Sequence, residues 1–150
     1  MLSVRPLFHA RVDVGEVLSI GHTPLGERRV IDILGGTFLG ERLAGRVRPG
    51  GADWQVIGVD GTAHLDARYT LETDEGALIQ VRSQGLRHGP PDVLARIAAG
   101  EVVVPVAYYF RTALRFETAA PSLDWLNRIL AVGVGARRAR AVELDVHEIR

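Results

Sequence analysis

GGADWQVIGVDGTAHLDARYTLETDEGALIQVRSQG, residues 50–85, is the stretch of the chain that decides its fold. Two acidic turns that end in glycine, Asp60-Gly61 and Asp74-Glu75-Gly76, divide it into three segments of strand length. Such turns join antiparallel neighbours, because glycine accepts the positive φ that a tight hairpin requires. The stretch therefore predicts three consecutive antiparallel strands.

The middle segment, residues 63–73, alternates strictly between polar and apolar residues. One face carries His64, Asp66, Arg68, Thr70 and Glu72, and the other carries Ala63, Leu65, Ala67, Tyr69 and Leu71. This alternation is typical of a strand with one polar and one apolar face. Two arrangements fit it. Either the polar face lines an internal pocket, or it lies in solvent while the apolar residues fill the interior.

Similar signals extend along the whole chain. Further strands are predicted over residues 6–14, 15–26, 27–34, 45–48, 53–59, 77–85, 102–118, 129–135 and 141–149. Gly35-Gly36 is expected to end the 27–34 strand. A short helix is predicted over 90–100, between a pair of prolines and a glycine, and a helical turn over 122–127. Turn signals about every 8–12 residues favour an all-β barrel or sandwich. We predict one all-β domain over residues 1–150, an antiparallel, calycin- or lipocalin-like β-barrel of about 8–10 strands with one or two short helices.

Composition excludes several classes of function. The net charge is zero, so no electrostatic footprint for nucleic acid is present. All 18 basic residues are arginine and cysteine is absent, which excludes lysine Schiff bases, thiolate nucleophiles and cysteine-based metal sites. No segment approaches the roughly 20 apolar residues of a membrane span, and the first residues do not resemble a signal peptide. We expect no membrane partner and a cytoplasmic location.

The residues that could carry chemistry are arginines, aspartates and aromatic residues on a few strands. A barrel of about eight strands has room inside for side chains or one small ligand. There an arginine could hold a carboxylate or enolate, and an aspartate with a raised pKa could act as a base. The candidate catalytic residues are Asp53, Asp66, Arg68 and Arg111. The candidate ligand-binding residues are Trp54, Arg82, Tyr109, Trp125 and Asn127.

Other interpretations of these residues stay open. Asp66 could simply pair with Arg68 or Arg82, and the two tryptophans could be core anchors. The five histidines show neither HExxH nor HxH spacing, so no metal is expected. No G-x-S-x-G elbow is present, and the Gly-rich segment 35–40 has no following lysine. We therefore expect a site without metal or organic cofactor.

The chain resembles an uncharacterised bacterial and fungal family known as domain of unknown function 3237, over about residues 7–149. The resemblance depends on five motifs in combination: Gly50 to Trp54, Asp66 to Tyr69, Thr73 to Gly76, Tyr109 to Arg111 and Trp125 to Asn127. Glu75 stands where the family's turn is expected to carry aspartate. The resemblance implies a calycin-like antiparallel barrel with a cavity for a small molecule. It implies no particular reaction, because the family has no general assigned activity.

Three functional hypotheses follow. The first is a cofactor-independent isomerase, cyclase or lyase that acts on a small, oxygenated, partly hydrophobic metabolite. The second is a non-catalytic carrier or sensor that binds such a molecule in the same cavity. The third is an assembly protein in which exposed edge strands pair to form a homodimer.

Overall fold

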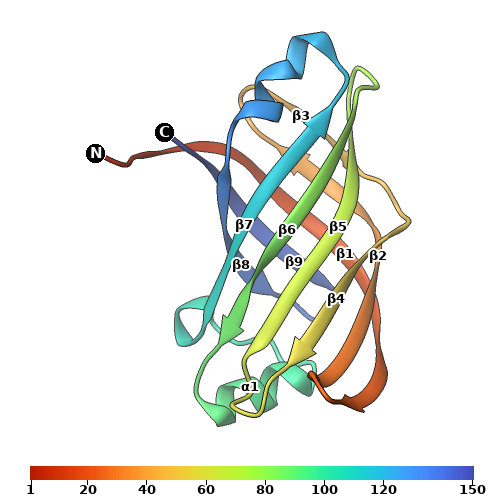
Figure 1. The fold of residues 1–150 in the computed structure, drawn as a ribbon, viewed down its shortest axis with the longest axis vertical. Coiled ribbons are helices and arrows are strands. Elements are labelled where there is room, and N and C mark those ends of the chain that lie inside the picture. The colour runs from red at the N-terminus through yellow and green to blue at the C-terminus, as the bar shows by residue number, and fades with distance from the viewer.

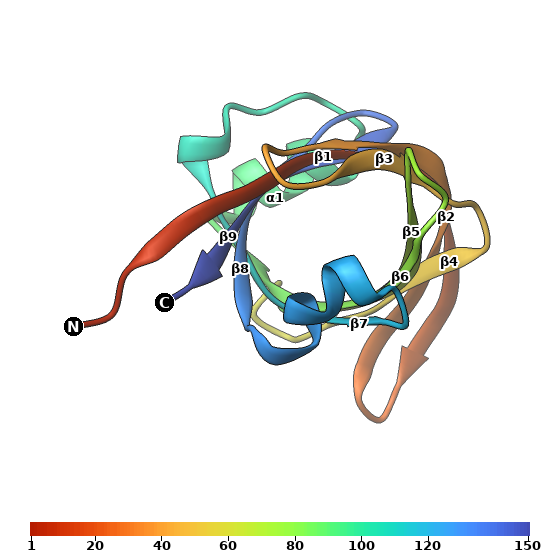
Figure 2. The same ribbon diagram turned by 90° about the horizontal axis from the view of Figure 1, so that it is seen from above.

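A single antiparallel sheet of nine strands closes on itself and forms a barrel (Figures 1 and 2). The computed structural model describes residues 1–150. The strands are β1 (Val4–Thr23), β2 (Gly26–Leu39), β3 (Ala44–Val47), β4 (Gly51–Ile57), β5 (Ala63–Thr73), β6 (Leu78–His88), β7 (Tyr109–Thr118), β8 (Ala131–Arg137) and β9 (Ala141–Ile149). The helical elements are α1 (Pro91–Ala98) and the 3₁₀ segments η1 (Pro105–Ala107) and η2 (Pro121–Arg128). The predicted all-β barrel is thus confirmed.

The long N-terminal strand closes the barrel. β1 pairs with β9 over its first half and with β2 over most of its length. β2 then pairs with both β3 and β4, and these two strands pair with β5. The meander from β5 to β9 completes the ring, because each of these strands pairs with the next. In a closed sheet of this kind, alternate residues of every strand face the interior.

Several predicted strand boundaries were wrong, and three of the differences have a clear physical cause. The predicted strands 6–14 and 15–26 form the single strand β1, in which β-bulges near Val14 and Ser19 absorb the irregularity. β2 continues through Gly35-Gly36 instead of ending there. Gly36 has a φ of +136°, and a Cβ at this position would lie 2.0 Å from the Arg11 carbonyl oxygen, so glycine lets the two strands pass closely. β7 begins only at Tyr109, because Pro105 starts a 3₁₀ turn.

The two ends of the barrel are filled differently. At the η2 end, a large apolar cluster fills the interior, and it includes Phe8, Phe38, Leu71, Phe116 and Leu126. At the opposite end, α1 packs through Val93 and Ile97 in a smaller cluster with residues such as Leu65 and Phe110. None of the helices is long and apolar enough to cross a membrane. The less densely filled end, under α1, is where polar side chains enter the barrel.

One strand edge remains free. Beyond Val14, β1 pairs with β2 on one side only, and exposed apolar residues such as Leu18 and Ile20 lie along this segment. Its β-bulges are a device that natural edge strands use against pairing with another chain. The hypothesis that exposed edge strands pair to form a homodimer stays a prediction.

We expect Gly135→Ala to destabilise the protein. A Cβ at Gly135 would lie 2.5 Å from the Phe110 ring, which would have to move within the barrel. Overpacking of this kind costs about 1–3 kcal/mol in the free energy of unfolding. Urea denaturation followed by circular dichroism measures the effect.

Gly15→Ala is the matched control, because a Cβ there would meet only ordinary contacts at 3.7–3.8 Å. The control should unfold within about 0.5 kcal/mol of the wild type. Equal stability of the two variants would show that Phe110 is not held by this close contact.

Candidate functional site

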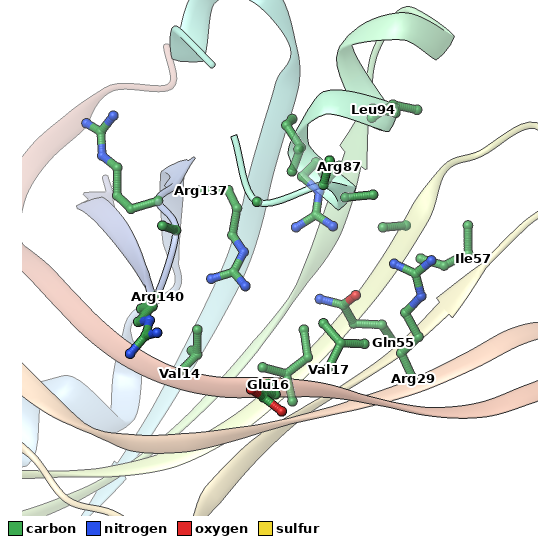
Figure 3. A pocket seen from close by; sticks show the side chains of 18 of the residues that line it. Val14, Glu16, Val17, Arg29, Gln55, Ile57, Arg87, Leu94, Arg137 and Arg140 are labelled. Atoms are coloured by element: carbon green, nitrogen blue, oxygen red, sulfur yellow. The ribbon is translucent and has the colours of Figure 1, made fainter. Parts of the chain in front are cut away.

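A cavity of about 900 Å³ lies between α1 and the open end of the barrel (Figure 3). Its walls come from β1, β2, β4, α1 and the β8–β9 turn. A smaller chamber of about 50 Å³ continues from it into the barrel. The two spaces share five lining residues, which form the boundary between them: Val14, Ile31, Gln55, Arg87 and Arg137.

The inner chamber contains polar groups that the protein leaves without hydrogen-bond partners. Asp53 is satisfied: Oδ1 accepts from the Asp66 backbone N–H at 3.0 Å, and Oδ2 accepts from Gln55 Nε2 at 2.8 Å. In contrast, Gln55 Oε1, the Tyr69 hydroxyl and Thr112 Oγ1 are buried without a partner in the protein. Buried polar atoms are nearly always paired, so three orphaned atoms around one chamber offer hydrogen-bonding positions to water or to a ligand's polar groups.

The environment of the chamber shifts the acidity of its carboxyl and phenol groups. Burial raises the pKa of Asp53 above its usual value, although the Gln55 and Asp66 hydrogen bonds and the Arg87 charge oppose the effect. Burial also raises the pKa of Tyr69 far above the ordinary range, and the Asp53 charge adds to this rise. Tyr69 therefore keeps its proton and offers a hydrogen-bond donor, while Asp53 ionises at a higher pH than an ordinary aspartate.

Two arginines stand at the boundary of the chambers without a carboxylate partner. Arg87 and Arg137 point into the cavity in Figure 3, and neither forms an ion pair. Arg29, in the same wall, differs, because its guanidinium contacts the Glu27 carboxylate at 3.2 Å. Burial lowers the pKa of both Arg87 and Arg137, and in Arg87 the neighbouring Arg137 cation adds to the effect. A guanidinium nevertheless stays a cation in proteins.

The structure separates the four predicted catalytic residues. Asp53 faces the inner chamber, since it lies opposite the inward Ile31 and Ala67. Asp66 and Arg68 belong to the other face of their strand and lie outside the barrel, as does Arg111. The polar face of β5 is thus the outer face, because the apolar face packs in the interior. The four residues do not share one cavity.

The predicted ligand-binding residues also lie away from the cavity lining. Arg82 is on the outer face, with its Nε 3.5 Å from Asp66 Oδ1. Trp54 and Tyr109 are exposed on the outside, where the Arg111 guanidinium lies 5.2 Å from the Tyr109 ring centre.

The remaining two predicted residues belong to the η2 end. Trp125 packs against the main apolar cluster, with the Arg42 guanidinium 4.2 Å from its ring centre. The Asn127 side chain bonds to the backbone N–H and carbonyl of Thr118, so it holds η2 on β7. These contacts are structural in kind.

Sequence reasoning missed Gln55, Tyr69, Arg87, Thr112 and Arg137. The signal that could have found the two arginines is the alternation of inward and outward residues, continued to the last residues of each strand. Arg87 follows the inward positions Val81 and Ser83 by even steps, and it lies opposite the buried residues Ala63 and Phe110. The predicted strands stopped at residues 85 and 135, two residues short of each arginine.

The chain matches a family model described as Protein of unknown function (DUF3237) over residues 2–149. The chain belongs to this family. A UPF0311 protein of Rhodopseudomonas palustris is 43% identical over 148 residues, which cover 99% of this chain and 97% of the relative. A UPF0311 protein of Clostridium acetobutylicum is 34% identical over 149 residues, or 99% of this chain and 94% of the relative.

Solved structures of similar proteins have the same barrel. The crystal structure of the conserved R. palustris protein of unknown function superposes with a TM-score of 0.95 at 42% identity, covering 100% of this chain and 98% of the other. A beta-barrel like protein of Acinetobacter baumannii gives a TM-score of 0.88 at 41% identity, covering 100% and 97%. An enzyme of Penicillium herquei gives a TM-score of 0.75 at 22% identity, covering 99% and 95%, a likeness that shows the fold alone.

The pKa shift of Asp53 predicts how Asp53→Asn changes stability with pH. Above about pH 4 an unfolded aspartate is ionised, whereas the folded Asp53 carboxyl resists ionisation, so the wild type loses stability as pH rises through this range. Asparagine has no such loss, and it keeps both hydrogen bonds if the Gln55 amide turns over to present Oε1. The variant should therefore be more stable at pH 7.

The gain should shrink as pH falls toward 4 and vanish only below the pKa of the unfolded aspartate, where Asp53 is neutral in both states. The other charged groups that act on Asp53, Asp66 on β5, Arg87 on β6 and Arg137 on β8, are unchanged in the variant. Thermal unfolding midpoints between pH 4 and pH 8 provide the measurement. A gain of constant size over that range would mean that Asp53 is ionised normally in the folded protein.

Proposed function

We propose that this DUF3237 protein is a cofactor-independent enzyme of isomerase, cyclase or lyase type. Its substrate is a small, oxygenated, partly hydrophobic molecule bound in the barrel cavity. The observation that carries the proposal is a carboxyl group with a raised pKa, Asp53, in a chamber where three other polar atoms lack partners. Perturbed titratable groups in a cavity are typical of active sites.

The proposed chemistry is a proton transfer. The Asp53 carboxylate removes a proton from a carbon next to a substrate carbonyl. The electron pair moves onto the carbonyl oxygen, and the Tyr69 hydroxyl and the Arg87 guanidinium stabilise the resulting oxyanion. Asp53 then returns the proton elsewhere on the molecule, or a leaving group departs. The sequence of steps needs no oxidant or reductant.

The inner chamber is suited to this chemistry for two reasons. Tyr69 remains protonated, so it can donate to a developing negative charge without competing for the substrate's proton. Donors that are fixed in a water-poor site act more strongly than in solution, and removal of one typically costs about 2.7–4 kcal/mol of barrier lowering. The barrel is also compatible with catalysis, since its distant structural neighbour from P. herquei is described as an enzyme.

Deuterium exchange tests the proposal without knowledge of the net reaction. The protein is incubated in D₂O with a panel of small aryl and alkyl ketones, enones, lactones and hydroxy acids, and mass spectrometry measures incorporation. Asp53→Asn should reduce exchange of any active compound by about 10²–10⁴-fold, because a positioned acid–base group contributes that much. Tyr69→Phe should also reduce it, by about 10²-fold.

Asp66→Asn is the matched control, because this substitution removes the same negative charge from the outer face of the barrel. It should exchange at close to the wild-type rate, because the Asp66 charge is the smallest of the effects on the Asp53 pKa. Full activity of Asp53→Asn together with loss in Asp66→Asn would refute the interior site. A compound that binds in the cavity and never exchanges would instead favour the carrier hypothesis.

A further inference from the structure

The boundary between the two chambers carries two cations that the protein does not neutralise. Arg137 uses one N–H to bond the Ala141 carbonyl at 3.2 Å, and the Arg87 guanidinium lies 5.8 Å from the Phe110 ring centre. A guanidinium has five N–H donors, so most donors of both side chains remain available. Both side chains line both chambers, which places these donors at the passage between them.

Intramolecular neutralisation does not explain the pair. Asp53 is the only carboxylate of the inner chamber, and its two oxygens already accept hydrogen bonds from Gln55 and the Asp66 backbone. One carboxylate also leaves one of two cations uncompensated. Both arginines are half-buried, and two cations held near each other in a cavity repel unless an anion binds between them.

The residues that line the outer chamber indicate what the rest of the ligand is like. The inner side of α1 contributes Leu94, Ala95, Ile97 and Ala98, and Val17 and Ile57 stand in the wall as well. The volume of about 900 Å³ is in the range of clefts that bury drug-sized molecules. An apolar body of one or two rings fits this space, with its polar end toward the inner chamber.

The rim of the cavity is cationic too. Arg138 and Arg140 of the β8–β9 turn line the outer chamber, where Glu16 is the single acidic lining residue. Arg138 is paired with Glu143 at 2.8 Å, whereas Arg140 forms no ion pair. A cleft with an excess of one charge concentrates ligands of opposite charge and speeds their entry.

We propose that the ligand is an organic oxyanion, a carboxylate, phenolate or enolate, held between Arg87 and Arg137 with its apolar body beneath α1. The inference rests on the proposed function only in that it uses the same cavity as the binding site, and it does not require that the protein be a catalyst. Planar, bidentate guanidinium groups match the geometry of such oxyanions. The substrate class of the proposed enzyme is thus narrowed to anionic molecules.

Isothermal titration calorimetry with naphthoate and naphthamide tests the inference on the wild-type protein. The two probes have the same apolar body and differ in charge. Naphthoate should bind at least 10-fold more tightly, because loss of a charge-assisted hydrogen bond costs at least that factor. Equal affinities, or no binding of naphthoate at millimolar concentration, would overturn the proposal.

Arginine variants then locate the anion. Arg87→Gln and Arg137→Gln should each weaken naphthoate binding by about 10- to 100-fold and leave naphthamide binding nearly unchanged. Arg87→Lys should show an intermediate loss, since lysine keeps the charge but not the fork. Arg140→Gln, the same charge change at the exposed rim, should weaken binding by less than about 3-fold. Wild-type affinity in both the Arg87 and Arg137 glutamine variants would contradict the assignment.

Nitrophenol distinguishes the phenolate arm from the carboxylate arm by its absorbance. A site that binds phenolates lowers the apparent pKa of nitrophenol in the presence of the protein. A site restricted to carboxylates leaves that pKa unchanged. Either result, together with tight naphthoate binding, supports the proposal. Asp53→Asn separates the two proposals: it should retain or strengthen naphthoate binding while it loses deuterium exchange. Exchange without any preference for anions would refute this inference alone, whereas anion binding without exchange would refute the enzyme alone.

Discussion

The closed sheet imposes one constraint on which the rest of the structure depends: each strand residue must face either the interior or the solvent, and parity decides which. On β5, Leu65 and Tyr69 face inward, and their neighbours Asp66 and Arg68 therefore face outward. The inward parity of β4 brings Asp53 and Gln55 into the barrel, and that of β6 and β8 brings in Arg87 and Arg137. A one-residue shift in register would exchange the two sets.

The same constraint explains why the site occupies one end. Toward η2, the inward positions carry large apolar side chains that fill the barrel, and they supply most of the stabilising burial. Toward α1, several inward positions carry polar or small residues instead, including Gly133 and Gly135, which make room for Thr112 and Phe110. The strands of the hollow half continue into the packed half, which stabilises them. Asp53, Tyr69 and the two arginines therefore lie on strands rather than on loops.

Much of the fold could be predicted from the sequence, because turns and period-two alternation are local signals. The strands 63–73 and 141–149 and the short helix near Pro91 lie where the pattern places them. The continuity of β1 through its bulges is a tertiary effect, since pairing with β2 overrides the glycine at position 15.

The candidate site was predicted less well for a physical reason. Alternation shows that a strand has two faces but not which face points inward, and the charged face of β5 attracted the functional assignment. Of the nine predicted site residues, Asp53 lines the cavity. Arg87 and Arg137 lie near strand ends, at positions that share a face with inward apolar residues. An arginine at such a position is the sequence signal for this candidate site.

The central claim is that the barrel interior, rather than its charged outer face, is the place where the protein binds an anionic ligand. A crystal structure with bound bromobenzoate tests this most directly, because the anomalous signal of bromine identifies that atom among all others. We expect the carboxylate between Arg87 and Arg137 and the bromine beneath α1. Bromine sites confined to the outer face near Arg68 and Arg82, with an unoccupied interior, would contradict the account.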